Sequence, residues 1–189
     1  MRNLSAFLRR LIYVMVVVAL LVAACGAVIR YGLTNTTALI VRHAERAAGD
    51  GDPPLSPEGS LRAMALAHVV EDANVAAAYC TQYKRTRSTV EPLAQQANIS
   101  ITEISADQVE MLVLHVLTNH AGKTVVIAGH SNTVPQIVHQ LGGGLVPPIS
   151  GNEYDNLYVV IVHEVSILRV LGLPLRKVDT LRLKYGAKT

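Results

Sequence analysis

The 189-residue sequence has no tryptophan, one phenylalanine, only two cysteines and few charged residues. Two cysteines, Cys25 and Cys80, cannot form the disulfide framework typical of small secreted domains. The net charge of +3 comes from scattered residues and gives no argument for a nucleic-acid partner, so none is expected. Half of the residues are nevertheless hydrophobic. Because aromatics are only 4%, that hydrophobicity comes from Ala, Val, Leu and Ile, which suits a compact α/β core.

A run without charged residues, from Leu11 to Ile29, follows a short basic N-terminus. Its 19 residues would span ~28 Å as a helix, close to the hydrocarbon thickness of a bilayer. Arg2, Arg9 and Arg10 precede the run and only Arg30 follows directly, which predicts a cytoplasmic N-terminus. We therefore expect residues 1–30 to attach the protein to a membrane. The rest of the chain is expected outside the cytoplasm, in a bacterial periplasm or cell envelope.

Two kinds of attachment fit this N-terminus. Val22-Ala23-Ala24-Cys25 resembles a bacterial lipobox, in which Cys25 would be lipidated after cleavage of a signal. The residues that follow, Gly26 to Ile29, stay apolar and favour an uncleaved transmembrane helix instead. The sequence leaves both alternatives open.

Strand-like and helix-like segments alternate after a linker expected at 31–37. Apolar periodicity and turn residues predict strands at 37–41, 76–80, 99–104, 123–128, 157–165 and 180–185, and helices at 56–71, 84–98, 107–120 and 133–141. Such alternation predicts an α/β fold, a three-layer α/β/α sandwich around a mainly parallel sheet. The final strands, which have no helix between them, are candidates for an antiparallel edge. Residues 38–189 are thus expected to form one catalytic domain.

Charged and polar side chains stand where the apolar strands end. One strand ends in Arg42-His43, another ends in Gly129-His130, and Arg85 follows a third. Because parallel strands end at the same edge of a sheet, we expect these side chains to surround one pocket. Guanidinium groups match phosphate oxygens, and histidine is a competent covalent nucleophile. The pattern therefore predicts a site for a phosphorylated dianion.

Four segments resemble the histidine phosphatase superfamily, which includes phosphoglycerate mutases and phosphohistidine phosphatases. Arg42-His43-Ala44-Glu45 is similar to its R-H-x-E signature. The other three follow in family order: Leu55 to Ala63 resembles L-[ST]-x-x-G-x-x-[QR]-A, Thr81 to Thr89 resembles S-x-x-x-R-[AT]-x-x-T with Thr81 in place of Ser, and Val125 to Ser131 resembles V-x-V-x-x-G-H-[SG]. The resemblance extends over roughly 38–185 and implies a phosphoglycerate mutase-like fold.

The resemblance implies a role for each site residue. His43 would be the nucleophile that forms a phosphohistidine, while Arg42, Arg85 and His130 would bind the phosphoryl oxygens and stabilise the transition state. Ser131 would add to the phosphate site for a separate reason, because it lies at an expected helix N-terminus, where backbone N–H groups favour anions. Glu45 has two alternatives, since it would either hold the His43 ring or lie at the rim of the pocket. No metal or cofactor is expected, because the arginines supply the positive charge.

The proton donor for the leaving oxygen is where the sequence departs from the family. Ser131 occupies the position of the aspartate that follows the second histidine in acid phosphatases of this family. Asp107, expected to open a helix, and Glu153, in the loop before a late strand, are the candidates. If neither serves, the enzyme would depend on substrates with good leaving groups.

These features predict a phosphatase that acts through a phosphohistidine on phosphomonoesters or related phosphoryl groups. Its partner would be a small phosphorylated substrate or a phosphoprotein. A phosphoglycerate mutase-type phosphotransferase is one alternative, although the short domain has little sequence to close over a bisphosphate. A catalytically silent phosphate-binding module is the other.

Overall fold

A computed structural model describes residues 2–165 and 175–189. The chain divides into two compact units. One comprises Met1–Thr34 with Glu164–Arg176, and the other comprises Asn35–His163 with Lys177–Thr189. The second unit contains all the candidate catalytic residues.

The N-terminal run forms a single helix, α1 (Arg2–Gly32). Within it, Phe7–Gly26 has a mean hydropathy of 2.2 and is unburied, so it is long and apolar enough to cross a membrane. A signal sequence near an N-terminus has the same properties. The residues expected as a linker, 31–37, lie in the end of α1 and the first half of β1 (Leu33–Arg42).

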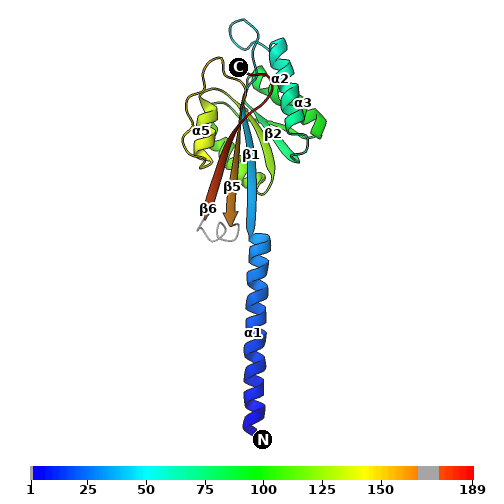
Figure 1. The fold of residues 1–189 in the computed structure, drawn as a ribbon, viewed down its shortest axis with the longest axis vertical. Coiled ribbons are helices and arrows are strands. Elements are labelled where there is room, and N and C mark those ends of the chain that lie inside the picture. Colours follow the sequence, from blue (N-terminus) through cyan, green and yellow to red (C-terminus); the bar gives the residue numbers. More distant parts are fainter. Residues whose placement is uncertain (1, 166–174) are drawn as a thin grey trace. The chain divides into compact units, whose positions relative to one another are not determined.

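One six-stranded sheet forms the centre of the fold, with the strand order β3-β2-β4-β1-β5-β6 (Figure 1). Besides β1, the strands are β2 (Val75–Cys80), β3 (Ile101–Glu103), β4 (Thr124–Gly129), β5 (Asn156–Val165) and β6 (Arg176–Lys184). The pairs β1–β4, β4–β2 and β2–β3 are parallel.

Helices cover both faces of this sheet. They are α2 (Pro57–Val69), α3 (Lys84–Ala97), α4 (Val109–Asn119) and α5 (Thr133–Gln140). Successive residues of β1 point to opposite faces: Ile40 packs in a cluster with residues of α4 and α5, and Val41 packs in a cluster with residues of α2 and α3. Pro92 lies inside α3 without ending it. The expected three layers are therefore present.

The expectation of a mainly parallel sheet is wrong, because the sheet is mixed. In Figure 1, β5 runs opposite to β1, and β6 returns beside β5. The reason lies in the segment between α5 and β5. Its residues Ser150 and Glu153 accept hydrogen bonds from Arg42, at the end of β1. The chain has thus already returned to the carboxyl edge before β5 begins, and β5 can only run back from there.

The parallel core brings the two histidines together. β1 and β4 pair in register from Thr37↔Thr124 to Arg42↔Gly129. The next residue of each strand is a histidine, His43 or His130. The amide N–H of His43 also donates to the carbonyl of Gly129 at 2.8 Å, which continues the pairing beyond the strand.

The packing of α2 against the core can be tested by comparing a buried leucine with an exposed one. Leu66 is fully buried, whereas Leu61 on the same helix is 63% exposed. Leu66→Ala should lower the free energy of unfolding by about 2–5 kcal/mol, because it removes buried contacts and leaves a cavity. Leu61→Ala should change it by less than about 0.5 kcal/mol. Urea unfolding of the full-length protein in mild detergent measures both, and equal effects would contradict this packing.

Candidate active site

His43 follows β1 and is 5% exposed. Its Nδ1 lies 2.8 Å from the carbonyl oxygen of Ala44. A carbonyl oxygen only accepts, so Nδ1 carries the proton and Nε2 keeps its lone pair. The Ala44 amide in turn donates to Thr89 Oγ1 of α3 at 2.9 Å. The backbone around His43 is therefore held so that Nε2 is the available nucleophilic atom.

Arg42 is also buried, and its guanidinium is held mainly by neutral groups. Its Nη1 donates to the carbonyls of Ser150 at 2.7 Å and Glu153 at 3.1 Å. Its Cζ lies 4.1 Å from the centre of the Tyr154 ring, within cation–π range. Its Nε is buried and has no hydrogen-bond partner in the described part of the chain. Arg42 therefore retains a positive charge and an unused donor.

Arg85 lies in the first turn of α3 and has a similar environment. Its Cζ lies 4.2 Å from the centre of the Tyr83 ring. Its Nη1 is 3.4 Å from Asp52 Oδ1, and Asp52 also accepts hydrogen bonds from the Lys84 amide at the helix N-terminus. The Nε of Arg85, like that of Arg42, is buried without a partner among residues 2–165 and 175–189.

His130 is the fourth residue at this edge of the sheet, beside His43, Arg42 and Arg85. Its ring centre lies 5.4 Å from that of His43 and 5.2 Å from that of Tyr83, in edge-to-face arrangements. Its Nε2 is 3.0 Å from Thr81 Oγ1 at the end of β2. The structure therefore brings Arg42, His43, Arg85 and His130 to one edge of the sheet, as the sequence predicts.

Burial and the two guanidinium groups keep both imidazoles neutral. Burial, together with the charges of Arg42 and Arg85, lowers the pKa of His43 to about 3, against an opposing effect of the hydrogen bond to the Ala44 carbonyl. The pKa of His130 is lowered to about 4 by burial and by Arg85 and Arg42, against an opposing effect of Asp52. A neutral His43 is the protonation state that a nucleophile requires.

Glu45 does not hold the His43 ring, which was one of its two expected alternatives. Its carboxylate binds Arg62 of α2 in two places, with Arg62 Nη2 to Oε1 at 2.7 Å and Nε to Oε2 at 2.9 Å. The ring nitrogen of His43 that Glu45 was expected to hold is instead bound by the Ala44 carbonyl. Gly59 of α2 lies against this segment, because a Cβ there would collide with the Glu45 carbonyl.

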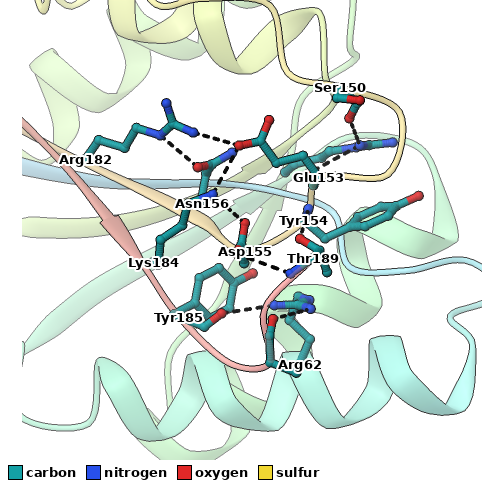
Figure 2. Close-up of polar contacts among 12 residues, drawn as sticks. Arg62, Ser150, Glu153, Tyr154, Asp155, Asn156, Arg182, Lys184, Tyr185 and Thr189 are labelled. Atoms are coloured by element: carbon teal, nitrogen blue, oxygen red, sulfur yellow. Dashed lines mark hydrogen bonds and ion pairs between the residues drawn. The ribbon is translucent and has the colours of Figure 1, made fainter.

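Arg62 links Glu45 to the last described residues of the chain. It is 4% exposed and donates to the carbonyls of Tyr185 and Ala187, at 3.0 and 2.9 Å. Thr189 Oγ1 accepts from the Tyr154 amide at 3.0 Å, and Asp155 binds Lys184 of β6 at 2.6 Å (Figure 2). The segment after β6 thereby holds the loop that carries Tyr154, which lies over Arg42.

Among the described residues, neither carboxylate expected as a proton donor is hydrogen-bonded to any of these four side chains. Glu153 binds Arg182 at 2.6 Å and Lys184 at 3.1 Å, and its side chain is turned toward Arg182 (Figure 2). Hydrogen bonds from Asn156 and Lys184 lower its pKa, so it stays ionised. Asp107 precedes α4 rather than opening it. It lines a cavity of about 590 Å³ with Asn132, Thr133 and Gln136, so this cavity reaches the turn that follows His130.

Ser131 directly follows His130, two residues before α5 begins, and is partly exposed. Sequence reasoning missed three other residues: Tyr83, Tyr154 and Asp52. Tyr83 lies inside the Thr81–Thr89 motif, where an aromatic two residues before an arginine could have been noticed. Tyr154 and Asp52 lie in loops, and no pattern marks them. Among the described residues, no three His, Cys, Asp or Glu side chains gather as metal ligands would.

The low pKa values of His43 and His130 predict how the stability of the folded protein depends on pH. The unfolded chain binds protons on these residues near pH 6.5 and the folded protein does so only near 3 and 4. The folded state therefore loses stability as the pH falls below about 6.5, by up to about 1.4 kcal/mol per pH unit for each histidine. In NMR titrations of the full-length protein, the Cε1–H signals of both should stay still down to about pH 5. Movement centred near pH 6.5 in the folded protein would contradict this assignment.

The comparisons with known proteins agree with this geometry. A model of the histidine phosphatase superfamily (branch 1) matches residues 28–107, which include Arg42, His43 and Arg85. No curated protein sequence matches the chain.

Several solved structures share the fold. The protein histidine phosphatase SixA complexed with tungstate is 18% identical with a TM-score of 0.56, over 78% of this chain and 96% of that one. A mycobacterial glucosyl-3-phosphoglycerate phosphatase is 12% identical with a TM-score of 0.57, over 82% of this chain and all of the other. YhfR of Bacillus stearothermophilus is 19% identical with a TM-score of 0.54, over 67% and 90%.

At these identities the solved structures establish the fold, and the sequence match covers the strand, loop and helix that carry the first half of the site. Three of the chain's four motifs lie at the carboxyl ends of β1, β2 and β4, and the fourth, Leu55 to Ala63, leads into α2. The histidine phosphatase superfamily is thus the family that this protein resembles in both sequence and fold.

Proposed function

We propose that this protein is a phosphatase that hydrolyses phosphomonoesters or related phosphoryl groups through a phosphohistidine on His43. One observation carries the proposal. Two guanidinium groups, each with a buried Nε that has no partner among the described residues, lie beside two neutral imidazoles at one sheet edge. Buried unpaired donors are costly unless a ligand uses them, and a phosphoryl group supplies the acceptors and the negative charge.

In the first step, Nε2 of His43 attacks phosphorus and the bond to the leaving oxygen breaks. The proton on Nδ1 stays in its hydrogen bond to the Ala44 carbonyl, which keeps Nε2 unprotonated and supports the positive charge that develops on the ring. Arg42 and Arg85 donate to the equatorial oxygens, where charge gathers in the transition state. Because both guanidiniums are already held by their neighbours, little reorganisation is needed.

In the second step, water attacks phosphorus and the electron pair of the P–N bond returns to Nε2 of His43. The products are inorganic phosphate and the neutral imidazole from which the cycle began. The resemblance to phosphatases of phosphohistidine proteins and of glucosyl-3-phosphoglycerate supports a small phosphorylated substrate or a phosphoprotein.

The N-terminal helix supports a second part of the proposal. Phe7–Gly26 has the length and hydropathy of a membrane span, and the flanking arginines favour an N-terminus in the cytoplasm. We infer that residues 1–30 anchor the domain to a membrane and that the phosphatase works outside the cytoplasm.

Replacing the nucleophile tests the mechanism. His43→Ala should lower turnover of p-nitrophenyl phosphate by more than about 10³-fold, because it removes the nitrogen that forms the covalent intermediate. His68→Ala serves as the matched control, since His68 is an exposed histidine near the end of α2 that pairs with Glu71, and it should keep full activity. Acid-quench labelling with a ³²P-substrate should place the label on His43.

Label on another residue, or full turnover by His43→Ala, would overturn the phosphohistidine mechanism. A wild-type protein that binds phosphate without any turnover of this easy leaving group would instead be a silent binding module.

Fractionation tests the anchor. The full-length protein should stay with the membranes after an alkaline carbonate wash, because the apolar surface of α1 favours lipid over water. Globomycin then separates the two forms of attachment. A mobility shift that Cys25→Ser abolishes would indicate lipidation, whereas an unchanged mobility would indicate an uncleaved helix. Recovery of the untreated protein in the soluble fraction would contradict membrane anchoring.

A further inference from the structure

The hydroxyl groups next to His130 determine which of its ring nitrogens carries the proton. Thr86 Oγ1 lies 2.8 Å from the carbonyl oxygen of Tyr83 and 3.2 Å from that of Thr81. Two oxygens approach this closely only when a proton lies between them, and a carbonyl has none to give. The single hydroxyl proton of Thr86 is therefore donated to a carbonyl, and the shorter distance indicates Tyr83.

The next two hydrogen bonds follow from that first one. Thr81 Oγ1 lies 2.9 Å from Thr86 Oγ1, and because Thr86 has already used its proton, Thr81 must donate. Thr81 has then used its own proton as well. The contact of 3.0 Å between Thr81 Oγ1 and His130 Nε2 therefore needs a proton from the ring. His130 carries its proton on Nε2, and the chain of donors runs from His130 through Thr81 and Thr86 to the backbone.

The other ring nitrogen of His130, Nδ1, is consequently unprotonated and can only accept a hydrogen bond. Nδ1 of His130 points away from Thr81 and makes no hydrogen bond with any residue that the structure describes. The charged and titratable groups around this ring are Arg42 from β1, Arg85 and Tyr83 from α3 and its cap, Asp52 from the loop before α2, and His43. Both guanidiniums oppose a proton on Nδ1 until an anion compensates their charge.

This tautomer has a consequence for the proposed function, on which the inference rests. A neutral His130 with its proton on Nε2 cannot donate to a phosphoryl oxygen. It can do so only after Nδ1 takes up a proton, which a bound phosphoryl dianion favours by its charge. In the described part of the chain, neither Asp107 nor the Glu153 carboxylate is hydrogen-bonded to His43 or His130, so neither is in direct contact to pass a proton to them.

We propose that His130 Nδ1 carries the proton of both steps, as general acid toward the leaving oxygen and then as general base toward water, and that Thr81 is the positioning residue that fixes this tautomer. The substrate enters as its monoanion, and its proton moves to Nδ1. When His43 attacks, that proton passes to the leaving oxygen, which departs as an alcohol or phenol. Nδ1, again bare, then accepts a proton from the attacking water, and the phosphate that forms takes it away.

Leaving groups of different basicity test the role of His130. A glutamine amide can still bind a phosphoryl oxygen but cannot exchange a proton, so His130→Gln separates the two roles. For phenyl phosphate, kcat/KM should fall by about 10²–10³-fold, because this leaving group needs a proton, whereas for 2,4-dinitrophenyl phosphate it should fall by about 10-fold or less. Equal losses for both substrates would overturn the proposal and leave His130 as a binding group. Full turnover by His43→Ala is a separate outcome, which would remove the proposed function instead.

The role of Thr81 has a spectroscopic test in the full-length protein in detergent. With ¹⁵N-labelled histidine, the wild-type protein should show His130 protonated at Nε2 alone, and tungstate, a tetrahedral dianion, should add a proton at Nδ1. Thr81→Ser keeps the hydroxyl and should keep both the spectrum and the pH profile. Thr81→Val removes it and should give mixed tautomers, with kcat lower by about 10-fold.

A wild-type spectrum with the proton on Nδ1 would overturn the assignment, whether or not the valine variant folds. An unchanged tautomer in a folded Thr81→Val protein would show that Thr81 has no positioning role.

Discussion

The in-register parallel pairing of β1 with β4 is the constraint on which the rest of the site depends. Arg42 pairs with Gly129, and the hydrogen bond of 2.8 Å from the His43 amide to the Gly129 carbonyl extends the pairing past the strand. A shift of β1 by one residue would turn His43 to the other face of the sheet and separate it from His130. The buried alternation of Ile40 and Val41 between the two core clusters prevents that shift, so the hydrophobic core fixes the position of His43.

The positive charges of Arg42 and Arg85 lie at the carboxyl edge of the sheet, where few carboxylates neutralise them. Arg42 is supported by two carbonyls and a tyrosine ring, and Arg85 by another tyrosine ring and the single carboxylate of Asp52. The ion pairs of Glu45 with Arg62 and of Asp155 with Lys184 are shorter, and they connect structural elements to one another without involving Arg42 or Arg85. Burial is the main cause of the low pKa of both histidines, and the same uncompensated charge that suits a phosphoryl dianion lowers those pKa values further. The charge that would bind a dianion therefore also helps to keep His43 neutral.

Much of the fold and half of the site are predictable from sequence because they depend on local patterns. Apolar runs that end in Arg42-His43 and Gly129-His130 predict strands that end at one edge, and a helix after a strand places Arg85 there. Glu45 and Glu153 were harder to place, because their partners Arg62 and Arg182 come from distant segments. The reversal at β5 was missed for a related reason, since it depends on the path of a loop with no regular pattern. Asp107 was expected at a helix start that lies two residues later, at Val109.

By itself the sequence determined which residues meet at the carboxyl edge of the sheet, because the motif residues follow strands whose apolar patterns are strong. It also determined the long apolar N-terminal helix, which composition alone specifies. Only the tertiary structure decided the protonation of the site and the partners of its charges. Those depend on burial and on hydrogen bonds between residues far apart in the chain, such as His130 with Thr81, Arg42 with the loop at 150–154, and Arg62 with the segment after β6. The pairing of such groups is set by the packing of the layers and leaves no periodic signal in the sequence.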